Sequence, residues 1–490
     1  MAKGHCTSRM IGQMIGQRSI LIDKGFCQVC KVWLPRALSM TAASPSTAKL
    51  AHGSVPAHLI SQTMPMVFGV AAMMSIGLID SYFIGQLGRE ALAAISFIFP
   101  VLVAINSLAV GVMVGINSVV ARALGEGNQD KAVRLANLGL IFSLGVGIVM
   151  GAAMYVLIDP IFTLMNAPAD LMPLIRTYLV PFAFGFPLTL LVMGCNGVLR
   201  AQGEAKKTSY VSFTFAGVNW VLDPILITGA FGWPGLGIMG AAYATIIGWG
   251  FGLVMAIYLV RKADLPIEPA RAMKGKVAEH LGAIVKVGLP AACSNAINPM
   301  GLSVLTALVA LEGEAAVAGF GAAGRLQSFA VVPLLALSGS IGAIVGQNWG
   351  ANRFDRAREA ATYSFGFCIV WGLAIAIPMA LAGEWFAQAF TDDPAVIKEF
   401  ALYLRIAAWG YLGFGLLIVC NGIMNAVDHA SYALVQSIAR VFLVMLPVAW
   451  ALQTSWGSEA IYTAELAANA FGAASAIVLT MFVLKWRAPA

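Results

Sequence analysis

Twelve long apolar runs dominate the chain and leave few folds open to it. Most exceed the roughly 20 residues that an α-helix needs to cross the hydrocarbon core of a bilayer. The runs are continuous, whereas strands of a membrane β-barrel alternate apolar and polar residues. Only 11% of the residues are charged, against about 25% in a soluble domain. The sequence therefore predicts an all-α polytopic membrane protein with twelve transmembrane helices. We place them near 60–85, 91–122, 132–158, 172–199, 208–230, 236–260, 281–311, 316–347, 357–383, 397–424, 432–454 and 458–485.

Basic residues gather in alternate loops, and this predicts the orientation of the chain. Cytoplasmic loops of membrane proteins carry an excess of Lys and Arg. The basic set comprises Arg122, Lys131, Arg134, Arg200, Lys206, Lys207, Arg261, Lys262, Arg271, Lys274, Lys276, Lys286, Arg353, Arg356, Arg358, Lys485 and Arg487. We therefore expect both termini on the cytoplasmic side of a cell inner (plasma) membrane. The net charge of +7 belongs to this topology signal and does not indicate nucleic-acid binding.

The two halves of the chain repeat at a constant offset of 225 residues, as between Pro65 and Pro290. Other pairs are Gly88 and Gly313, Gly125 and Gly350, Asp130 and Asp355, Tyr178 and Tyr403, Gly185 and Gly410, Asn196 and Asn421, and Ser212 and Ser437. Each half holds six expected helices, an even number, so both halves enter the membrane from the same side. Such parallel repeats are typical of alternating-access transporters. The repeat predicts two six-helix lobes.

The repeat also predicts the domain boundaries. We expect an N-terminal lobe at 57–260, a cytoplasmic linker at 261–280 and a C-terminal lobe at 281–490. Residues 1–56 lack a long apolar core, so we interpret them as a disordered cytoplasmic tail or an over-extended start, with Met40 as the true start. Cys27 and Cys30 form a lone CxxC in this tail, a weak zinc signal because no second pair follows.

Two acidic residues lie well inside apolar segments, and such residues are usually functional. Asp80 lies in the first segment and Asp223 in the fifth. Asn219 precedes Asp223 by four residues and so shares its helical face. Pro224 removes a backbone donor and leaves the carbonyl one turn earlier without its helical partner. The repeat counterparts of the two acids, Leu305 and Val448, are apolar, which predicts a cation site in the N-terminal lobe only.

The side chains of Asp80, Asn219 and Asp223 are rich in oxygen and could hold either a proton or a sodium ion. A low-dielectric environment favours the protonated form of a carboxyl group, and hard oxygen ligands equally suit a small cation such as sodium. All five histidines lie in the tail, loops or helix ends, which argues against proton coupling through histidine. Glu465, about two turns into the last segment, is interpreted as a snorkelling or helix-end acid.

Over roughly residues 57–485, the chain resembles the multidrug and toxic compound extrusion (MATE) transporters. The resemblance rests on IDSYFIGQLGREALAA after Pro65, the loop GEGNQDKA, NGVLRAQGEAK, VNWVLDPILITG, GIMGAAYAT and VGQNWGANRFDRA. It implies a two-lobed transporter, not an enzyme, that exports small organic, often cationic, compounds in exchange for sodium or protons. We expect a monomer that contacts membrane lipid and needs no cofactor besides the coupling ion.

The resemblance also implies site residues. In the DinF-like prokaryotic branch, the cation site comprises positions that match Asp80, Asn219, Asp223, Thr245 and Tyr178 here, and sodium would bind at the first four. Thr245 and Tyr178 come from the resemblance alone. Other branches carry a glutamate on the seventh helix and an acid on the tenth, and this chain has neither, which favours the DinF-like assignment. Asn295 and Asn298 on the seventh segment are interpreted as substrate-contacting or packing residues.

Two other classes of function are weighed against this one. A flippase for a lipid-linked substrate would have a cavity lined by several arginines, for which Arg325 is the main candidate. An intramembrane aspartyl protease also needs two membrane carboxylates. Its YD and GxGD motifs surround neither Asp80 nor Asp223, so a transporter is favoured.

Overall fold

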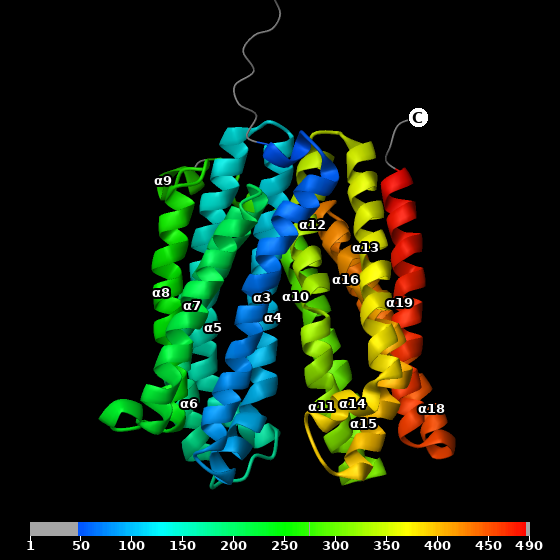
Figure 1. The fold of residues 1–490 in the computed structure, drawn as a ribbon. Coiled ribbons are helices and arrows are strands. Elements are labelled where there is room, and N and C mark those ends of the chain that lie inside the picture. Colours follow the sequence, from blue (N-terminus) through cyan, green and yellow to red (C-terminus); the bar gives the residue numbers. More distant parts are fainter. Residues whose placement is uncertain (1–47, 274, 487–490) are drawn as a thin grey trace, which may run out of the picture. The chain divides into compact units, whose positions relative to one another are not determined.

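The computed structural model describes residues 48–273 and 275–486, and helices are the regular structure throughout these ranges (Figure 1). Among the described residues, eleven helical segments are long and apolar enough to span a bilayer, and a bent pair makes a twelfth. This confirms the predicted fold class. The predicted metal signal at Cys27 and Cys30 lies outside the described residues.

Six long helices form the N-terminal lobe, blue to green in Figure 1, and each matches one predicted segment. Helix α7 packs against α3 and α8, and α6 packs against α4, α5 and α8. The helices are α3 (Val55–Gly85), α4 (Arg89–Gly125), α5 (Gln129–Leu164), α6 (Met172–Ala201), α7 (Ala205–Thr228) and α8 (Ile238–Arg261). A single turn, α9 (Pro269–Ala272), lies in the linker to the second lobe.

The C-terminal lobe has more breaks than the sequence predicts. Its helices are α10 (Val277–Val309), α11 (Glu314–Ala330), α12 (Val332–Gly350), α13 (Phe354–Leu381), α14 (Gly383–Gln388), α15 (Pro394–Ala407), α16 (Tyr411–Ala426), α17 (Ala430–Ile438), α18 (Leu446–Trp456) and α19 (Ser458–Trp486). The predicted eighth segment is the pair α11 and α12, bent by 44°. Pro333 in the first turn of α12 explains the bend, because proline has no N–H for the ladder. A π-helical turn, Ala439–Met445, joins α17 to α18.

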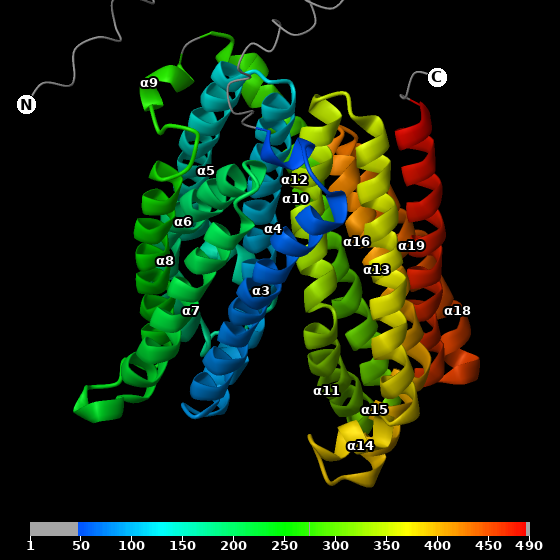
Figure 2. The same ribbon diagram turned by 45° about the horizontal axis from the view of Figure 1, so that its top comes forward.

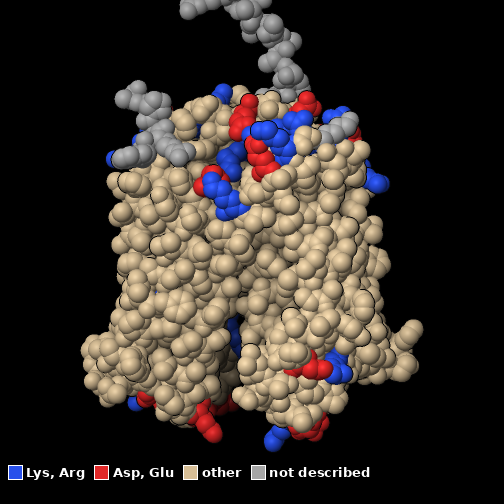
Figure 3. Space-filling view, turned by 180° about the vertical axis from the view of Figure 1, so that it is seen from behind, with Lys and Arg blue, Asp and Glu red and all other residues tan. Residues whose placement is uncertain are grey.

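The two lobes meet at the end of the molecule that carries the basic loops and separate toward the other end (Figures 1 and 2). Helix α10 packs against α4, and α12 packs against α3 and α4. The space-filling view shows charged residues gathered at the first end and the surface hollowed between the lobes at the other (Figure 3). Lys or Arg atoms are visible deep in this cleft.

The closed end has approximate two-fold symmetry down to single contacts. A Cβ added to Gly125 would overlap the carbonyl oxygen of Gln347, and one added to its repeat partner Gly350 would overlap that of Arg122. Arg122 and Gln347 are themselves repeat partners, 225 residues apart. Arg122 donates to the carbonyl of Ala426 at 3.0 Å, and Gln347 donates to that of Ala201 at 2.6 Å. Each lobe therefore holds the other by the same pair of contacts.

The residues just before α3 also belong to this closed end. The backbone N–H of Leu50 donates to Gln347 of α12 at 2.9 Å, and the Arg353 guanidinium donates to the carbonyl of Ala51 at 2.6 Å. Lys49 forms an ion pair with Glu204 at 2.7 Å. Residues 48–54, which the sequence analysis places in the tail, therefore have a defined place against both lobes.

Candidate cation site and central cavity

Helix α7 carries the two polar side chains around which the candidate cation site is built. Asn219 and Asp223 both have an exposed fraction of 0%. Within residues 48–273 and 275–486, neither the amide atoms of Asn219 nor the carboxyl oxygens of Asp223 have a hydrogen-bond partner. Pro224 follows within the same helix, and α7 ends at Thr228, capped by Gly229 in a left-handed conformation. The helix thus presents bare oxygen ligands in the interior of the lobe.

Asp80 on α3 completes a pair of carboxyl groups. Its side chain interacts directly with that of Asp223, and one of its oxygens is buried without a partner. Tyr178 on α6 is buried and lies within electrostatic range of both carboxyl groups. The structure therefore brings Asp80, Asp223 and Tyr178 together from three helices.

The predicted Thr245 lies on a fourth helix of the same lobe. It is buried on α8, which packs against both α6 and α7. Close packing holds these helices together: a Cβ on Gly240 of α8 would overlap the Leu226 carbonyl of α7, and one on Gly185 of α6 would lie 2.7 Å from Ile246. Large side chains at these glycines would separate the helices that carry the site.

The chemistry of the site follows from its unpartnered atoms. A buried polar group without a hydrogen bond costs about 1–3 kcal/mol, and more if it is charged. Two carboxylates in contact also repel each other unless a proton or a cation lies between them. Two carboxyl groups and one amide are hard ligands that fit a proton or a small cation. These residues therefore suit either a proton or a small cation.

In the C-terminal lobe, the repeat partners of Asp80 and Asp223 are apolar. The same lobe nevertheless contains a buried acid, Glu465, which does not align with either of them in the repeat. Leu305 is buried and Val448 packs against the same apolar cluster. Tyr403, the repeat partner of Tyr178, donates a hydrogen bond to Glu465 at 3.0 Å, and Gln327 donates to the same carboxylate at 3.1 Å. Glu465 has an exposed fraction of 5%. The interpretation of Glu465 as a snorkelling or helix-end acid is wrong, because its carboxylate is fixed inside the lobe.

We expect Glu465→Ala to lower the free energy of unfolding by about 2–3 kcal/mol, because Tyr403 and Gln327 lose a buried acceptor. Glu465→Gln keeps one acceptor oxygen and should lower the free energy of unfolding by less. Thermal unfolding of the detergent-solubilised protein checks this, with the exposed Glu459→Ala of the same helix as control. Unfolding curves for Glu465→Ala that match the wild type would show that the network does not stabilise the lobe.

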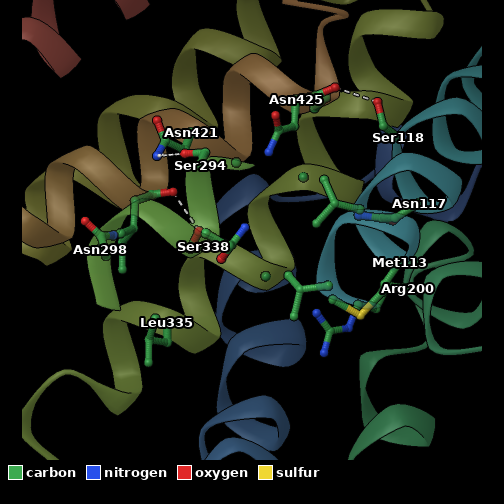
Figure 4. Close-up of a pocket in the computed structure, with 18 of the residues that line it drawn as sticks. Met113, Asn117, Ser118, Arg200, Ser294, Asn298, Leu335, Ser338, Asn421 and Asn425 are labelled. Carbon is green, nitrogen blue, oxygen red and sulfur yellow. Dashed lines mark hydrogen bonds between the residues drawn. The ribbon is translucent and has the colours of Figure 1, made fainter. Parts of the chain in front are cut away.

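A second polar region, the central cavity, lies between the lobes (Figure 4). Its volume is about 300 Å³, and it is lined from α4, α6, α10, α12 and α16. The predicted Asn295 and Asn298 both line it, and so does Arg200. The sequence analysis counted Arg200 among the loop residues, whereas the structure places it in the last turn of α6, facing the other lobe. Arg325, the predicted cavity arginine, is exposed on α11 and does not line this cavity.

Comparisons with known proteins agree with this architecture. The sequence model of the MatE family matches residues 65–225 and 290–451, which is the internal repeat at an offset of 225. An FAD transporter from Shewanella oneidensis is 33% identical over 80% of this chain and 86% of its own length. A probable multidrug resistance protein of Bacillus subtilis, YoeA, is 25% identical over 80% of this chain and 84% of its own length. A mutant of the Vibrio cholerae MATE transporter VcmN superposes with a TM-score of 0.84 at 27% identity, covering 90% of this chain and 98% of that one.

Two six-span lobes around a central cavity define a polytopic membrane transporter. The chain belongs to the MATE family of transporters.

Proposed function

We propose that the protein is a cation-coupled antiporter that exports organic compounds by alternating access. The observation that carries this proposal is the contact between Asp80 and Asp223 inside the N-terminal lobe, where three of the four carboxyl oxygens are buried without a hydrogen-bond donor among the described residues. A proton or a sodium ion satisfies them. The same four positions, Asp80, Asn219, Asp223 and Thr245, would hold sodium. These positions also support assignment to the DinF-like branch.

The distribution of charge supports an orientation for transport. The basic loops lie at the closed end and the cleft opens at the opposite end (Figure 3). By the positive-inside rule the closed end is cytoplasmic, so the conformation faces outward from a plasma membrane. In this state a coupling ion reaches the N-terminal lobe from outside while the substrate leaves.

Coupling requires that the ion and the substrate favour different states of the transporter. Asp80 and Asp223 lie on α3 and α7, which pack against each other, so an ion bound between the two carboxyl groups would act on this contact. Helix α3 also packs against α12 of the other lobe, and Thr63 bonds to Ser340 across this contact at 2.8 Å. Ion binding in one lobe can therefore alter the interface that encloses the cavity.

The relatives leave the substrate open. One is described as an FAD transporter and others as multidrug resistance or multidrug export proteins. We therefore propose a small organic substrate and use a flavin nucleotide and an organic cation as test compounds. The lipid-linked flippase remains the alternative; against it, Arg200 is the one charged residue lining the cavity within the described part of the chain.

The experiment is efflux from proteoliposomes that contain the purified monomer. A sodium gradient and a pH gradient are imposed one at a time, with flavin mononucleotide or ethidium as the exported probe. We expect one of the gradients to accelerate efflux of at least one probe, and an ionophore for that ion to abolish the effect. Equal efflux with either gradient and with none, for both probes, would contradict the proposal.

A further inference from the structure

The central cavity carries a positive charge, which is unusual for a site that binds cations. Its lining includes Arg200 and no Asp or Glu, among the described residues. The Nε atom of Arg200 is buried without a hydrogen-bond partner, and no described carboxylate forms an ion pair with this guanidinium. An unpaired buried charge is costly. The cavity therefore presents a positive charge that no group in the described ranges neutralises.

Arg200 reaches across the boundary between the lobes. It extends from the last turn of α6, and its Nη1 atom lies beside Gly339 of α12 (Figure 4). Its repeat partner is Asn425, which lines the cavity from α16. The repeat therefore places a cation on one side of the cavity and a neutral amide on the other. A substrate bound between them touches both lobes.

The other polar groups of the cavity are amides and hydroxyls. The Oδ1 atoms of Asn117, Asn421 and Asn425 are buried without partners. Asn298 is held from behind by Arg440, whose guanidinium donates to its Oδ1 atom and also to Asn469 at 2.8 Å. Because this oxygen is occupied, the Nδ2 amide of Asn298 is the group left to face a ligand. The cavity offers donors and acceptors together with one positive charge.

We propose that the cavity binds organic phosphates: a phosphate group on Arg200, with the rest of the molecule hydrogen-bonded to the asparagines. The guanidinium is suited to bidentate recognition of phosphate. A hydrogen-bonding organic moiety fills the unpartnered amide positions, and an organic cation leaves Arg200 unneutralised. This inference rests on the proposed transport function, because it names the substrate class of the same cavity.

The test compares ligands that differ by one phosphate. Riboflavin and flavin mononucleotide share a fluorescent ring, and only the second carries a phosphate. Fluorescence anisotropy with the purified full-length protein should show flavin mononucleotide binding about tenfold or more tightly than riboflavin or ethidium. Arg200→Gln should remove this preference, and Arg200→Lys, which keeps the charge but loses the bidentate geometry, should retain only part of it. The control Arg405→Gln removes an exposed arginine of α15 outside the cavity and should leave the preference intact.

The possible outcomes distinguish failure of this proposal from failure of the proposed coupling. Equal binding of riboflavin and flavin mononucleotide, or an undiminished preference in Arg200→Gln, would overturn it. If short-chain phosphatidic acid displaces flavin mononucleotide but ADP does not, the phosphate site belongs to lipid headgroups. This result would overturn the proposal that the cavity binds a soluble organic phosphate. Failure of the ion gradients to drive efflux of a phosphate probe that does bind would instead contradict the coupling, so the two proposals fail separately.

Discussion

Asp223→Asn should abolish gradient-driven export while leaving the protein inserted and folded. Asparagine has the same size as aspartate but cannot exchange a proton or supply a full negative charge to a cation. Asp80 would then stand alone in the site. We expect the gradient-dependent part of efflux from proteoliposomes to fall by about two orders of magnitude, the scale of losing a buried charged ligand.

A matched control separates this loss from damage to the fold. Asp159→Asn removes an exposed acid of α5 in the same lobe, where it pairs with Arg176, and should leave coupling intact. Asp80→Asn should resemble Asp223→Asn. Export by Asp223→Asn at the wild-type rate under the same gradient would refute the assignment of the site.

Gly125→Val and Gly350→Val should each open the closed end of the transporter. A side chain at either position overlaps the backbone of the opposite lobe, at Gln347 or at Arg122. Overpacking costs about 1–3 kcal/mol, which shifts the balance between outward-facing and inward-facing states by roughly five- to 150-fold. Because the contacts are related by the repeat, the two variants should have similar effects.

The shift can be measured as a distance between the lobes. Spin labels at Asp130→Cys and Asp355→Cys, both exposed and repeat partners, report on the closed end in a cysteine-free background. Longer distances are expected in both variants than in the parent. Gly145→Val and Gly366→Val, which meet no neighbouring atom, are the controls. Unchanged distances in Gly125→Val and Gly350→Val would show that these contacts do not hold the end closed.

The sequence predicted those features that stand out against an apolar background. Asp80, Asn219 and Asp223 are polar residues within long apolar runs. The free-energy cost of placing them in a membrane is enough to mark them as candidate site residues. The lobes were predictable because the repeat holds one register across the chain. Tyr178 and Thr245 give no such signal, since either residue type often packs inside a helix bundle, and only the family resemblance named them.

Three residues could not be predicted correctly because their roles depend on packing between distant helices. Arg200 lies near a helix end beside basic loop residues, where an arginine usually sets topology. Its position in the cavity follows from the approach of α12, which the sequence does not reveal. Arg122 is similar, since it bonds to Ala426 of the other lobe. Glu465 has no acidic repeat partner, and only the fold brings it to Tyr403.

The central claim is that an ion at Asp80 and Asp223 and a substrate in the central cavity favour different states. Linkage makes the effect reciprocal, so it is measurable at equilibrium. Flavin mononucleotide bound to the purified protein is titrated with sodium at constant pH, and separately with acid at constant sodium. We expect one of the two ions to weaken flavin mononucleotide binding by about five- to 150-fold in the wild type and not in Asp223→Asn. Affinity that is independent of both ions in the wild type, or equally dependent in Asp223→Asn, would contradict it.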